Sequence, residues 1–331
     1  MTLKPYIQKV AVGPRGSKDL TREEAREANN LILSGEVHPV EFGALTMAMR
    51  VKGEADSELI GAVDAFHDHC DPADWDIENL VTVASPFDGK DRLMVWTPAA
   101  ALLAAASGAK VLVLSDRDVP PKKGVTPSLV FQALGYPPTS TFAEAAELLR
   151  DRGWACVEMS RAIPALGPLK EWRELLGKRP YLSTAEKLIN PARSPYITGV
   201  FHGPVFRQMD RVVRELSYPK TLVVQGSQGS IEPKNSAPTN ACLIERDGET
   251  ETFKLDPGEF NLRIEEEVPL PGGPNECAAL TRRVFAGEDE DGMKATMLTA
   301  GMLLWISGVR EDMNQGVQLA ASRWQGVSGS L

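Results

Sequence analysis

The chain has 331 residues, 43% of them hydrophobic, which is enough to bury the core of an enzyme-sized body. Its longest apolar run, around Ala99 to Ala109, is shorter than the roughly 18 residues that a membrane helix needs. Residues 1–5 lack the apolar core of a signal peptide, and the four cysteines lack metal-ligand spacing. We therefore expect a cytoplasmic protein with isolated buried thiols and no membrane partner.

Three short helices are expected before residue 72. A capping-box pattern at Thr21 and Glu24 begins the first, and Gly35 ends it. Two more helices are expected over residues 39–52 and 55–69. Such a small bundle with surplus apolar surface predicts a homodimer interface. The apolar residues expected to contribute to it are Leu31, Ile32, Phe42, Leu45 and Met49.

After Pro72, short apolar strands alternate with helical stretches, which predicts a mostly parallel sheet flanked by helices. The expected strands cover residues 79–84, 110–114, 154–158 and 218–224. The expected helices cover residues 98–106, 127–134 and 142–150, followed by closing helices over 275–285, 293–307 and 312–324. Residues 248–261 are expected to form an acidic hairpin or loop. The fold class is therefore α/β, with a small N-terminal helical bundle.

The loop at residues 85–90 follows the first expected strand, where α/β proteins often grip a phosphate group. A phosphate cradle needs backbone N–H groups that converge on the anion. Pro86 has no N–H to donate, and Phe87 adds bulk where close approach is required. We therefore predict that this loop is a poor phosphate cradle.

Partial motifs occur in order along nearly the whole chain, at residues 84–89, 94–97, 174–191 and 222–232. Together they resemble the anthranilate phosphoribosyltransferase family, glycosyltransferase family 3. In that family a Gly-Thr-Gly-Gly-Asp-Gly loop binds phosphoribosyl pyrophosphate (PRPP), and a later Asp-Glu pair binds magnesium. Here only Asp88-Gly89 of the loop is unchanged, and Ile231 replaces the aspartate of the pair.

The resemblance implies a nucleoside phosphorylase/phosphoribosyltransferase-type fold. It implies a helical dimerisation domain of residues 1–72, joined by part of 160–190, and an α/β domain of residues 73–331. Glu232 would be the metal ligand if PRPP is bound with magnesium; no other cofactor is expected. An extra Leu176 shifts the alignment around Arg173, the nearest match to the family's anthranilate-contacting arginine. The implied ligand-binding or phosphate-binding residues are Ser85, Asp88, Gly89, Lys90, Thr97, Arg173, Gly226 and Gly229.

The net charge of −9 is unevenly distributed. Residues 245–291 contain 14 acidic and 5 basic side chains, whereas residues 161–220 contain 11 basic and 5 acidic ones. The basic segment forms either an ordinary solvated surface or an anion-binding groove. The candidate nucleic-acid groove consists of Lys178, Arg179, Arg193, Arg207 and Arg211.

Two functions from different classes remain open. The family includes a branch with altered PRPP loops that binds DNA or RNA through basic surfaces. Pro86, Phe87 and Ile231 favour that branch, in which anthranilate phosphoribosyl transfer is lost. The retained Asp88-Gly89 and Glu232 favour the alternative, an active phosphoribosyltransferase that uses PRPP and magnesium on anthranilate or another acceptor. Nucleoside phosphorolysis on the same fold has little support among the residues.

Overall fold

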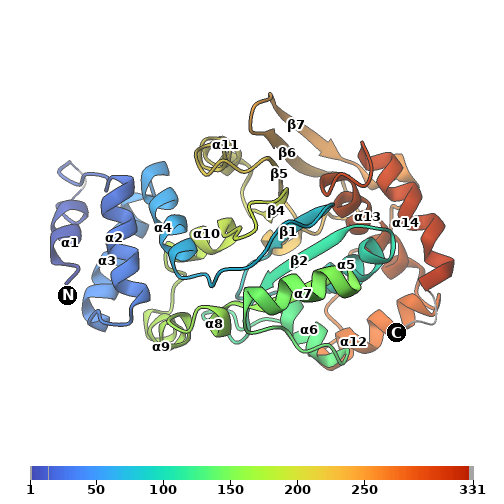
Figure 1. Ribbon diagram of the computed structural model, residues 1–331, viewed down its shortest axis with the longest axis horizontal. Coiled ribbons are helices and arrows are strands. Elements are labelled where there is room, and N and C mark those ends of the chain that lie inside the picture. Colours follow the sequence, from blue (N-terminus) through green and yellow to red (C-terminus); the bar gives the residue numbers. More distant parts are fainter. Residues whose placement is uncertain (1, 14, 328–331) are drawn as a thin grey trace.

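The computed structural model describes residues 2–13 and 15–327 and consists of a helical domain beside a larger α/β domain (Figure 1). The N-terminal helices lie at one end of the molecule and the sheet lies toward the other. The helical domain begins with α1 (Lys4–Val10), α2 (Arg22–Leu33), α3 (Pro39–Lys52) and α4 (Asp56–Asp68). The last three confirm the expected helices, whereas α1 was not predicted. No helix among the described residues is long and apolar enough to cross a bilayer.

Local signals explain the boundaries of these helices. Thr21 Oγ1 accepts a hydrogen bond from the Glu24 N–H at 3.2 Å, and the Glu24 carboxylate accepts one from the Thr21 N–H at 2.8 Å. This reciprocal pair is the predicted capping box. The buried Glu58 carboxylate accepts hydrogen bonds from the backbone N–H groups of Leu20 and Ala55 and pairs with Lys52 at 2.8 Å. One side chain thus ties the start of α4 to the end of α3 and the approach to α2.

The α/β domain contains a seven-stranded sheet in the order β3-β2-β1-β4-β5-β6-β7. The first five strands in this order are parallel, and β6 and β7 are antiparallel to their neighbours. The four expected strands are present, so the mostly parallel sheet is confirmed, but β4 and β6 were not predicted. The strands are β1 (Leu80–Ala84), β2 (Lys110–Ser115), β3 (Trp154–Glu158), β4 (Tyr196–Gly199), β5 (Lys220–Val224), β6 (Thr239–Glu245) and β7 (Thr250–Leu255).

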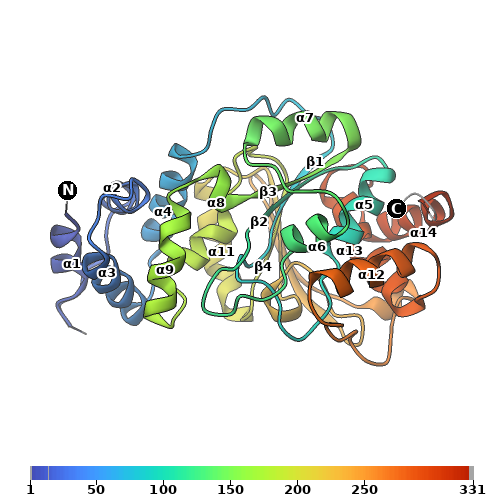
Figure 2. The same ribbon diagram turned by 90° about the horizontal axis from the view of Figure 1, so that it is seen from below.

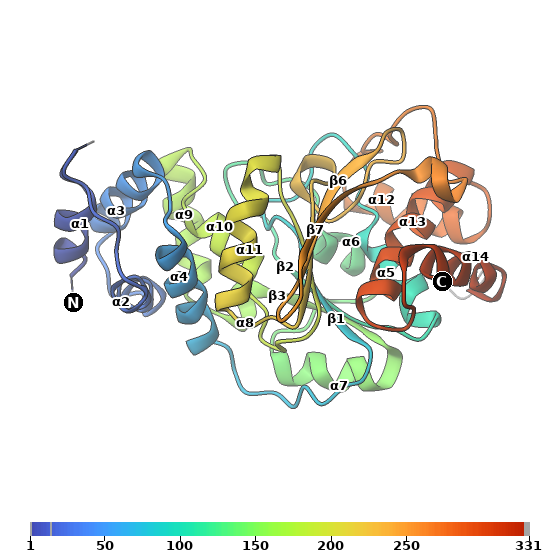
Figure 3. The ribbon, with the colours of Figure 1, turned by 90° about the horizontal axis from the view of Figure 1, so that it is seen from above.

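Both faces of the sheet are covered by helices, as expected for a parallel sheet (Figures 2 and 3). Val111 and Val113 pack into one core, and Leu112 and Leu114 pack into the other, so side chains alternate between the two faces. The helices of the first core are α5 (Thr97–Ala106), α6 (Pro127–Ala133), α12 (Pro274–Phe285), α13 (Glu290–Ile306) and α14 (Met313–Val327). The second core contains α7 (Phe142–Arg152) and α11 (Phe206–Glu215) together with α4.

After β3 the chain returns to the helical domain through α8 (Met159–Ala162), α9 (Leu166–Leu176) and α10 (Leu182–Ala185). The rings of Trp172 on α9 and Phe42 on α3 lie 5.2 Å apart. The Tyr181 hydroxyl donates a hydrogen bond to Asn29 on α2 at 2.7 Å. The division at residues 72 and 73, with part of 160–190 added to the helical domain, stays a prediction that agrees with these contacts.

Candidate ligand-binding site

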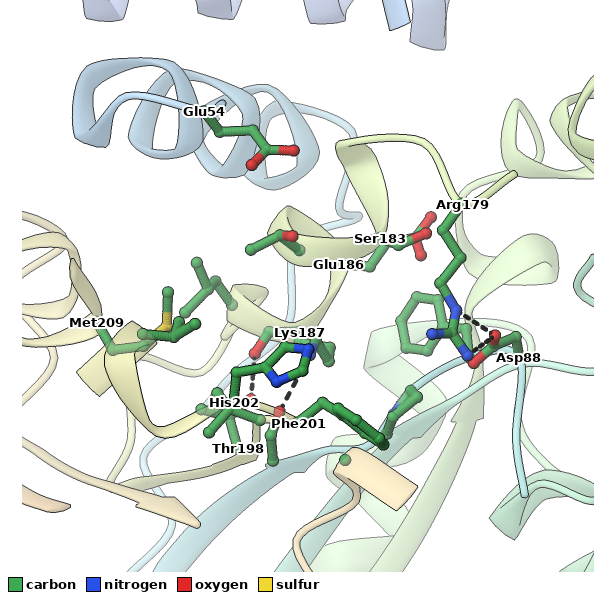
Figure 4. A pocket seen from close by; sticks show the side chains of 18 of the residues that line it. Glu54, Asp88, Arg179, Ser183, Glu186, Lys187, Thr198, Phe201, His202 and Met209 are labelled. Atoms are coloured by element: carbon green, nitrogen blue, oxygen red, sulfur yellow. Dashed lines mark hydrogen bonds and ion pairs between the residues drawn. The ribbon is translucent and has the colours of Figure 1, made fainter. Parts of the chain in front are cut away.

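A cavity of about 430 Å³ lies between the two domains at the carboxyl ends of β1, β4 and β5. Its walls include Asp88 from the loop after β1, Phe201 from the loop after β4, and Gly229 from the loop after β5. Glu54, from the turn after α3, reaches toward it from the helical domain (Figure 4). Ligands of open α/β sheets bind at this edge, and a cleft of this size is typical of a small-molecule site. This interdomain pocket is therefore the candidate ligand site.

Two ion pairs line the interdomain pocket. Arg179 donates to the Asp88 carboxylate at 2.6 Å on one side, as Figure 4 shows. Arg173 and Glu186 form a second pair in which both residues are buried. Burial raises the pKa of the Glu186 carboxyl, although the adjacent Arg173 guanidinium lowers it. Each of these two guanidinium groups has a carboxylate partner, so an incoming anion competes with Asp88 or Glu186 for it.

Lys187 is a half-buried cation of the pocket without a carboxylate partner among the described residues. Its Nζ donates to the Gly199 carbonyl at 3.1 Å, and burial followed by the nearby Arg179 charge lowers its pKa to about 8. The hydroxyls of Tyr196 and Thr198 both donate to the Lys187 carbonyl at 2.7 Å and hold its backbone in place. The amine can therefore attract an anion when protonated or accept a proton when neutral.

An exposed aromatic residue stands at the mouth of the pocket. Phe201 is 56% exposed, and its ring meets the ring of His202 edge to face with centroids 4.8 Å apart. Phe201 also borders a second cavity of about 560 Å³, which includes Arg92 and Lys234 in its lining. An aromatic ring between two basic cavities is suited to stacking against a flat ligand.

The loop after β1 is tightly packed against the protein. Gly89 has φ +72°, and a Cβ there would lie 2.6 Å from the carbonyl oxygens of Gly124 and Val125. The Gly89 N–H donates to the Pro86 carbonyl at 3.0 Å, and the Phe87 side chain is buried. The cavity behind the loop measures only about 10 Å³, roughly the space of a single water molecule. A pyrophosphate group does not fit there in this conformation.

The carboxylate of Glu232 is fully engaged by protein groups. Lys90 donates to one of its oxygens, and the Thr97 N–H and hydroxyl donate to the other at 2.8 and 2.7 Å. Among the described residues, no group of three His, Cys, Asp or Glu side chains is placed to hold a metal ion. Glu232 as arranged here does not fit the role of a magnesium ligand, because Lys90 already neutralises it.

The structure distributes the predicted ligand residues over three places. Asp88, Arg173 and Gly229 line the interdomain pocket, and Gly226 lines the second cavity. A Cβ at Gly226 would lie 2.2 Å from the Ser230 carbonyl oxygen, so this glycine is required for packing. The remaining four surround Glu232 or the small cavity behind the loop: Ser85, Gly89, Lys90 and Thr97.

The five residues of the predicted nucleic-acid groove do not line one cavity. Arg179 lines the interdomain pocket, and Lys178 is exposed next to it in sequence. Arg193 precedes β4, at the opposite end of that strand from the pocket, and donates to the Leu216 carbonyl at 3.2 Å. Arg211 pairs with Asp56 on α4, and Arg207 is exposed on α11. Of the five predicted groove residues, only Arg179 therefore lines the interdomain pocket. Charge density along the chain did not predict at which end of the strands the others lie.

Sequence reasoning did not single out several residues of the pocket as site residues. Lys187 lies inside the basic segment, but nothing local distinguishes it from its neighbours. Phe201 and His202 lie in the loop after β4, one of the strands that were not predicted. Recognition of that strand would have drawn attention to them, because residues after parallel strands face the ligand edge of the sheet.

Fold and pocket together define a two-domain α/β protein that holds a small-molecule site between its domains. The description "Glycosyl transferase family, helical bundle domain" matches residues 4–70, and "Glycosyl transferase family, a/b domain" matches residues 88–326. The chain belongs to this glycosyl transferase family, the family of the anthranilate phosphoribosyltransferases.

Relatives named anthranilate phosphoribosyltransferase support this assignment. The protein from Methylobacterium sp. strain 4-46 is 30% identical, with 97% of this chain and 93% of the relative covered. The one from Brevibacillus brevis is 30% identical over 92% and 89% of the two chains. The crystal structure of the Thermus thermophilus enzyme has 27% identity and a TM-score of 0.80, with 97% and 94% covered. A Saccharomyces cerevisiae structure in complex with PRPP and Mg has the same fold at 19% identity, with a TM-score of 0.81 and coverage of 98% and 94%.

Proposed function

We propose that this protein is a phosphoribosyltransferase that binds PRPP in the interdomain pocket and transfers its phosphoribosyl group to an aromatic acceptor. The convergence of Arg173, Arg179 and Lys187 on one pocket at the ligand edge of the sheet carries the proposal. The names of the relatives favour the same chemistry with anthranilate as acceptor. Because the loop after β1 is altered, we infer that residues outside this loop contact the phosphate groups.

In the proposed reaction, the bond between the sugar C1 and the pyrophosphate oxygen breaks as the acceptor nitrogen bonds to C1. Cationic side chains stabilise the charge that develops on the leaving pyrophosphate. The acceptor nitrogen loses its proton to water, while Lys187 stays protonated and contributes its positive charge to the pyrophosphate site. The ring pair of Phe201 and His202 at the pocket mouth supplies a stacking surface for an aromatic acceptor.

Calorimetric titration with PRPP tests the proposal. Wild type should bind it, and Lys187→Met should bind it about tenfold or more weakly, because a charge-assisted contact contributes about 1.5–3 kcal/mol. Lys178→Met is the matched control, since Lys178 is exposed and outside the pocket, and its affinity should be unchanged. Consumption of anthranilate, followed by its fluorescence, then tests the acceptor. Absence of PRPP binding to wild type at millimolar concentrations would contradict the proposal.

One observation favours a second function, binding of single-stranded nucleic acid. The exposed Phe201 lies between the interdomain pocket and the cavity that contains Arg92 and Lys234, so a strand could stack one base on it and place phosphates on both sides. The five predicted groove residues, Lys178, Arg179, Arg193, Arg207 and Arg211, remain a prediction for this function, with Arg179 common to both.

Salt dependence separates the two functions. For a strand that crosses Phe201, Arg92→Ala with Lys234→Ala should make the log–log salt slope shallower by about 1.4, since each single-strand phosphate contact contributes about 0.7. Phe201→Ala should weaken binding by about 1–3 kcal/mol through lost stacking. Anisotropy of a labelled oligonucleotide measures both effects. Oligonucleotide binding that is absent at low salt, or that does not increase with oligonucleotide length, would exclude this function.

We also propose that the protein is a cytoplasmic homodimer formed through its helical domain. The structure corrects the residues expected at this interface, because Ile32, Phe42, Leu45 and Met49 are buried inside the protomer. The exposed large apolar residues are instead Val40 and Val51 on α3 and Leu175 on α9, at 70%, 83% and 78% exposure. The two helices are in contact, because a Cβ at Gly43 on α3 would lie 3.6 Å from the Leu176 side chain. A second copy of the chain would cover this apolar surface.

A further inference from the structure

A buried lysine ammonium is held by oxygen atoms at the strand end beside the interdomain pocket. Lys90 Nζ donates to the Met94 carbonyl at 2.7 Å, to the Ser227 hydroxyl at 2.8 Å, and to the Glu232 carboxylate. An ammonium group has three N–H donors, and here each donor has an oxygen partner. The Lys90 and Glu232 side chains are both almost completely buried, so water does not screen the pair.

The backbone of Lys90 is held in place where its side chain enters this site. The Lys90 N–H donates to the Val125 carbonyl at 2.8 Å, and the Val125 N–H donates back to the Lys90 carbonyl at 2.7 Å. Gly124 packs so closely that a Cβ there would lie 2.5 Å from the Lys90 carbonyl oxygen. Two strand-like hydrogen bonds and a close glycine thus fix the backbone, and the three hydrogen bonds of Nζ hold the side chain against Glu232.

We propose that the Lys90 ammonium is a covalently tethered substitute for a divalent cation at Glu232. As a consequence, the protein binds its phosphorylated ligand without magnesium; this second statement rests on the proposed function. Carbonyl, hydroxyl and carboxylate oxygens are the ligands that magnesium and calcium prefer, and here a single side-chain cation holds all three. The distances of 2.7 and 2.8 Å are those of hydrogen bonds donated by an ammonium group.

A metal ion and Lys90 cannot share this site. The cavity bounded by Lys90, Glu232 and Ser85 has a volume of about 10 Å³, and a dication placed there would be within a few ångströms of the ammonium. Repulsion between the two charges in a buried environment would be strong. Removal of the lysine side chain instead leaves three oxygen ligands around an opened space that a cation can enter.

Manganese titration, followed by the electron paramagnetic resonance of free Mn²⁺, tests the substitution. Wild type should bind no Mn²⁺ at Glu232, whereas Lys90→Ala should bind one equivalent. Lys90→Ala combined with Glu232→Gln is the matched control and should lose that equivalent. Binding of one Mn²⁺ to wild type that Glu232→Gln abolishes would overturn the proposal. So would a Lys90→Ala variant that binds no more Mn²⁺ than the control.

The single variant leaves Glu232 as a buried charge without its partner, which can prevent folding. In that case the melting transition of Lys90→Ala should return on addition of Mn²⁺, while Lys90→Met with Glu232→Gln should fold without metal. A Lys90→Ala chain that stays unfolded at saturating Mn²⁺, beside a folded Lys90→Met/Glu232→Gln chain, would overturn the substitution.

Wild-type PRPP titrations in the presence of magnesium or of a chelator test the functional consequence. The dissociation constants should agree within about threefold, a difference of roughly 0.7 kcal/mol. An affinity at least tenfold higher with magnesium would refute metal-independent binding. Absence of PRPP binding under both conditions would refute the proposed function and the consequence that rests on it, while the manganese result would still decide the role of Lys90.

Discussion

The buried pair of Arg173 and Glu186 connects stability to ligand binding, and Arg173→Met separates the two. Both side chains are 3% exposed, and the guanidinium donates to both carboxylate oxygens. Arg173→Met keeps the apolar stem but leaves Glu186 buried without its partner. Breaking a buried pair from one side costs about 3–5 kcal/mol. We expect the free energy of unfolding in urea to fall by about that amount at neutral pH.

The stability of Arg173→Met relative to wild type should change with pH, because the substitution alters the pKa of Glu186. Burial already raises the pKa of Glu186, and loss of the guanidinium removes the nearby charge that lowers it. The folded variant then holds a proton that the unfolded chain releases above the ordinary pKa of a glutamate. Its stability relative to wild type should therefore decrease as pH rises from about 4.5, until the folded-state pKa is passed.

A double variant, Arg173→Met with Glu186→Met, serves as the control. Exchange of a buried ion pair for apolar residues of similar volume is often neutral for stability, so the double variant should unfold close to wild type. Its PRPP affinity should remain low, because the pocket has lost a guanidinium. A single variant that costs less than about 1 kcal/mol, or a double variant as unstable as the single one, would refute the assignment of a strong buried pair.

The remaining predictions concern a histidine, a glycine and the exposed apolar surface. Burial, and after it the charge of Arg193, lowers the pKa of His67 to about 4. As the pH falls from 6.5 to 4, the unfolded chain therefore binds a proton at His67 that the folded chain does not bind. Stability should drop by about 3 kcal/mol over that window, and His67→Gln should remove this part of the slope in urea titrations. Gly89→Ala should lower the melting temperature by several degrees, because its Cβ would meet backbone carbonyls at φ +72°; an unchanged melting temperature would contradict the tight packing of the loop. Val51→Glu with Leu175→Glu should yield a monomer in light scattering where wild type is a dimer, and a wild-type monomer at tens of micromolar would remove the proposed interface.

Features with a local chemical signal could be predicted from the sequence. Thr21 and Glu24 form the capping box within one helical turn, and Gly53 ends α3 because it adopts φ +85°. The long apolar strands at residues 110–115 and 154–158 were equally visible, since sheets covered on both faces have continuous apolar strands. The partial motifs supplied the family and hence the two-domain plan.

Features that depend on distant contacts could not be predicted. The strand β4 has four residues and follows Pro195, so neither its length nor its pattern distinguishes it from a loop. Lys90 and Glu232 are separated by 142 residues, and nothing near either one indicates their pairing. Residues that are close in sequence can also lie far apart. Arg193 is only six residues from Lys187, yet it lies at the opposite end of β4.

Because the chain returns to the helical domain after β3, that domain is built from two separate segments of the sequence. Three separate connections cross between the domains: residues 69–79, the segment from β3 to α9, and residues 189–195. A single proteolytic cut at residues 69–79 breaks the covalent link to α1–α4, but these helices still pack against α9 and the Tyr181 segment, which stay joined to the α/β domain. The helical domain also owes part of its packing to Trp172 and Tyr181, which are made more than a hundred residues after α2. During synthesis, part of the apolar surface of α1–α4 therefore stays exposed until β1, β2 and β3 of the parallel sheet and then Trp172 and Tyr181 have been made.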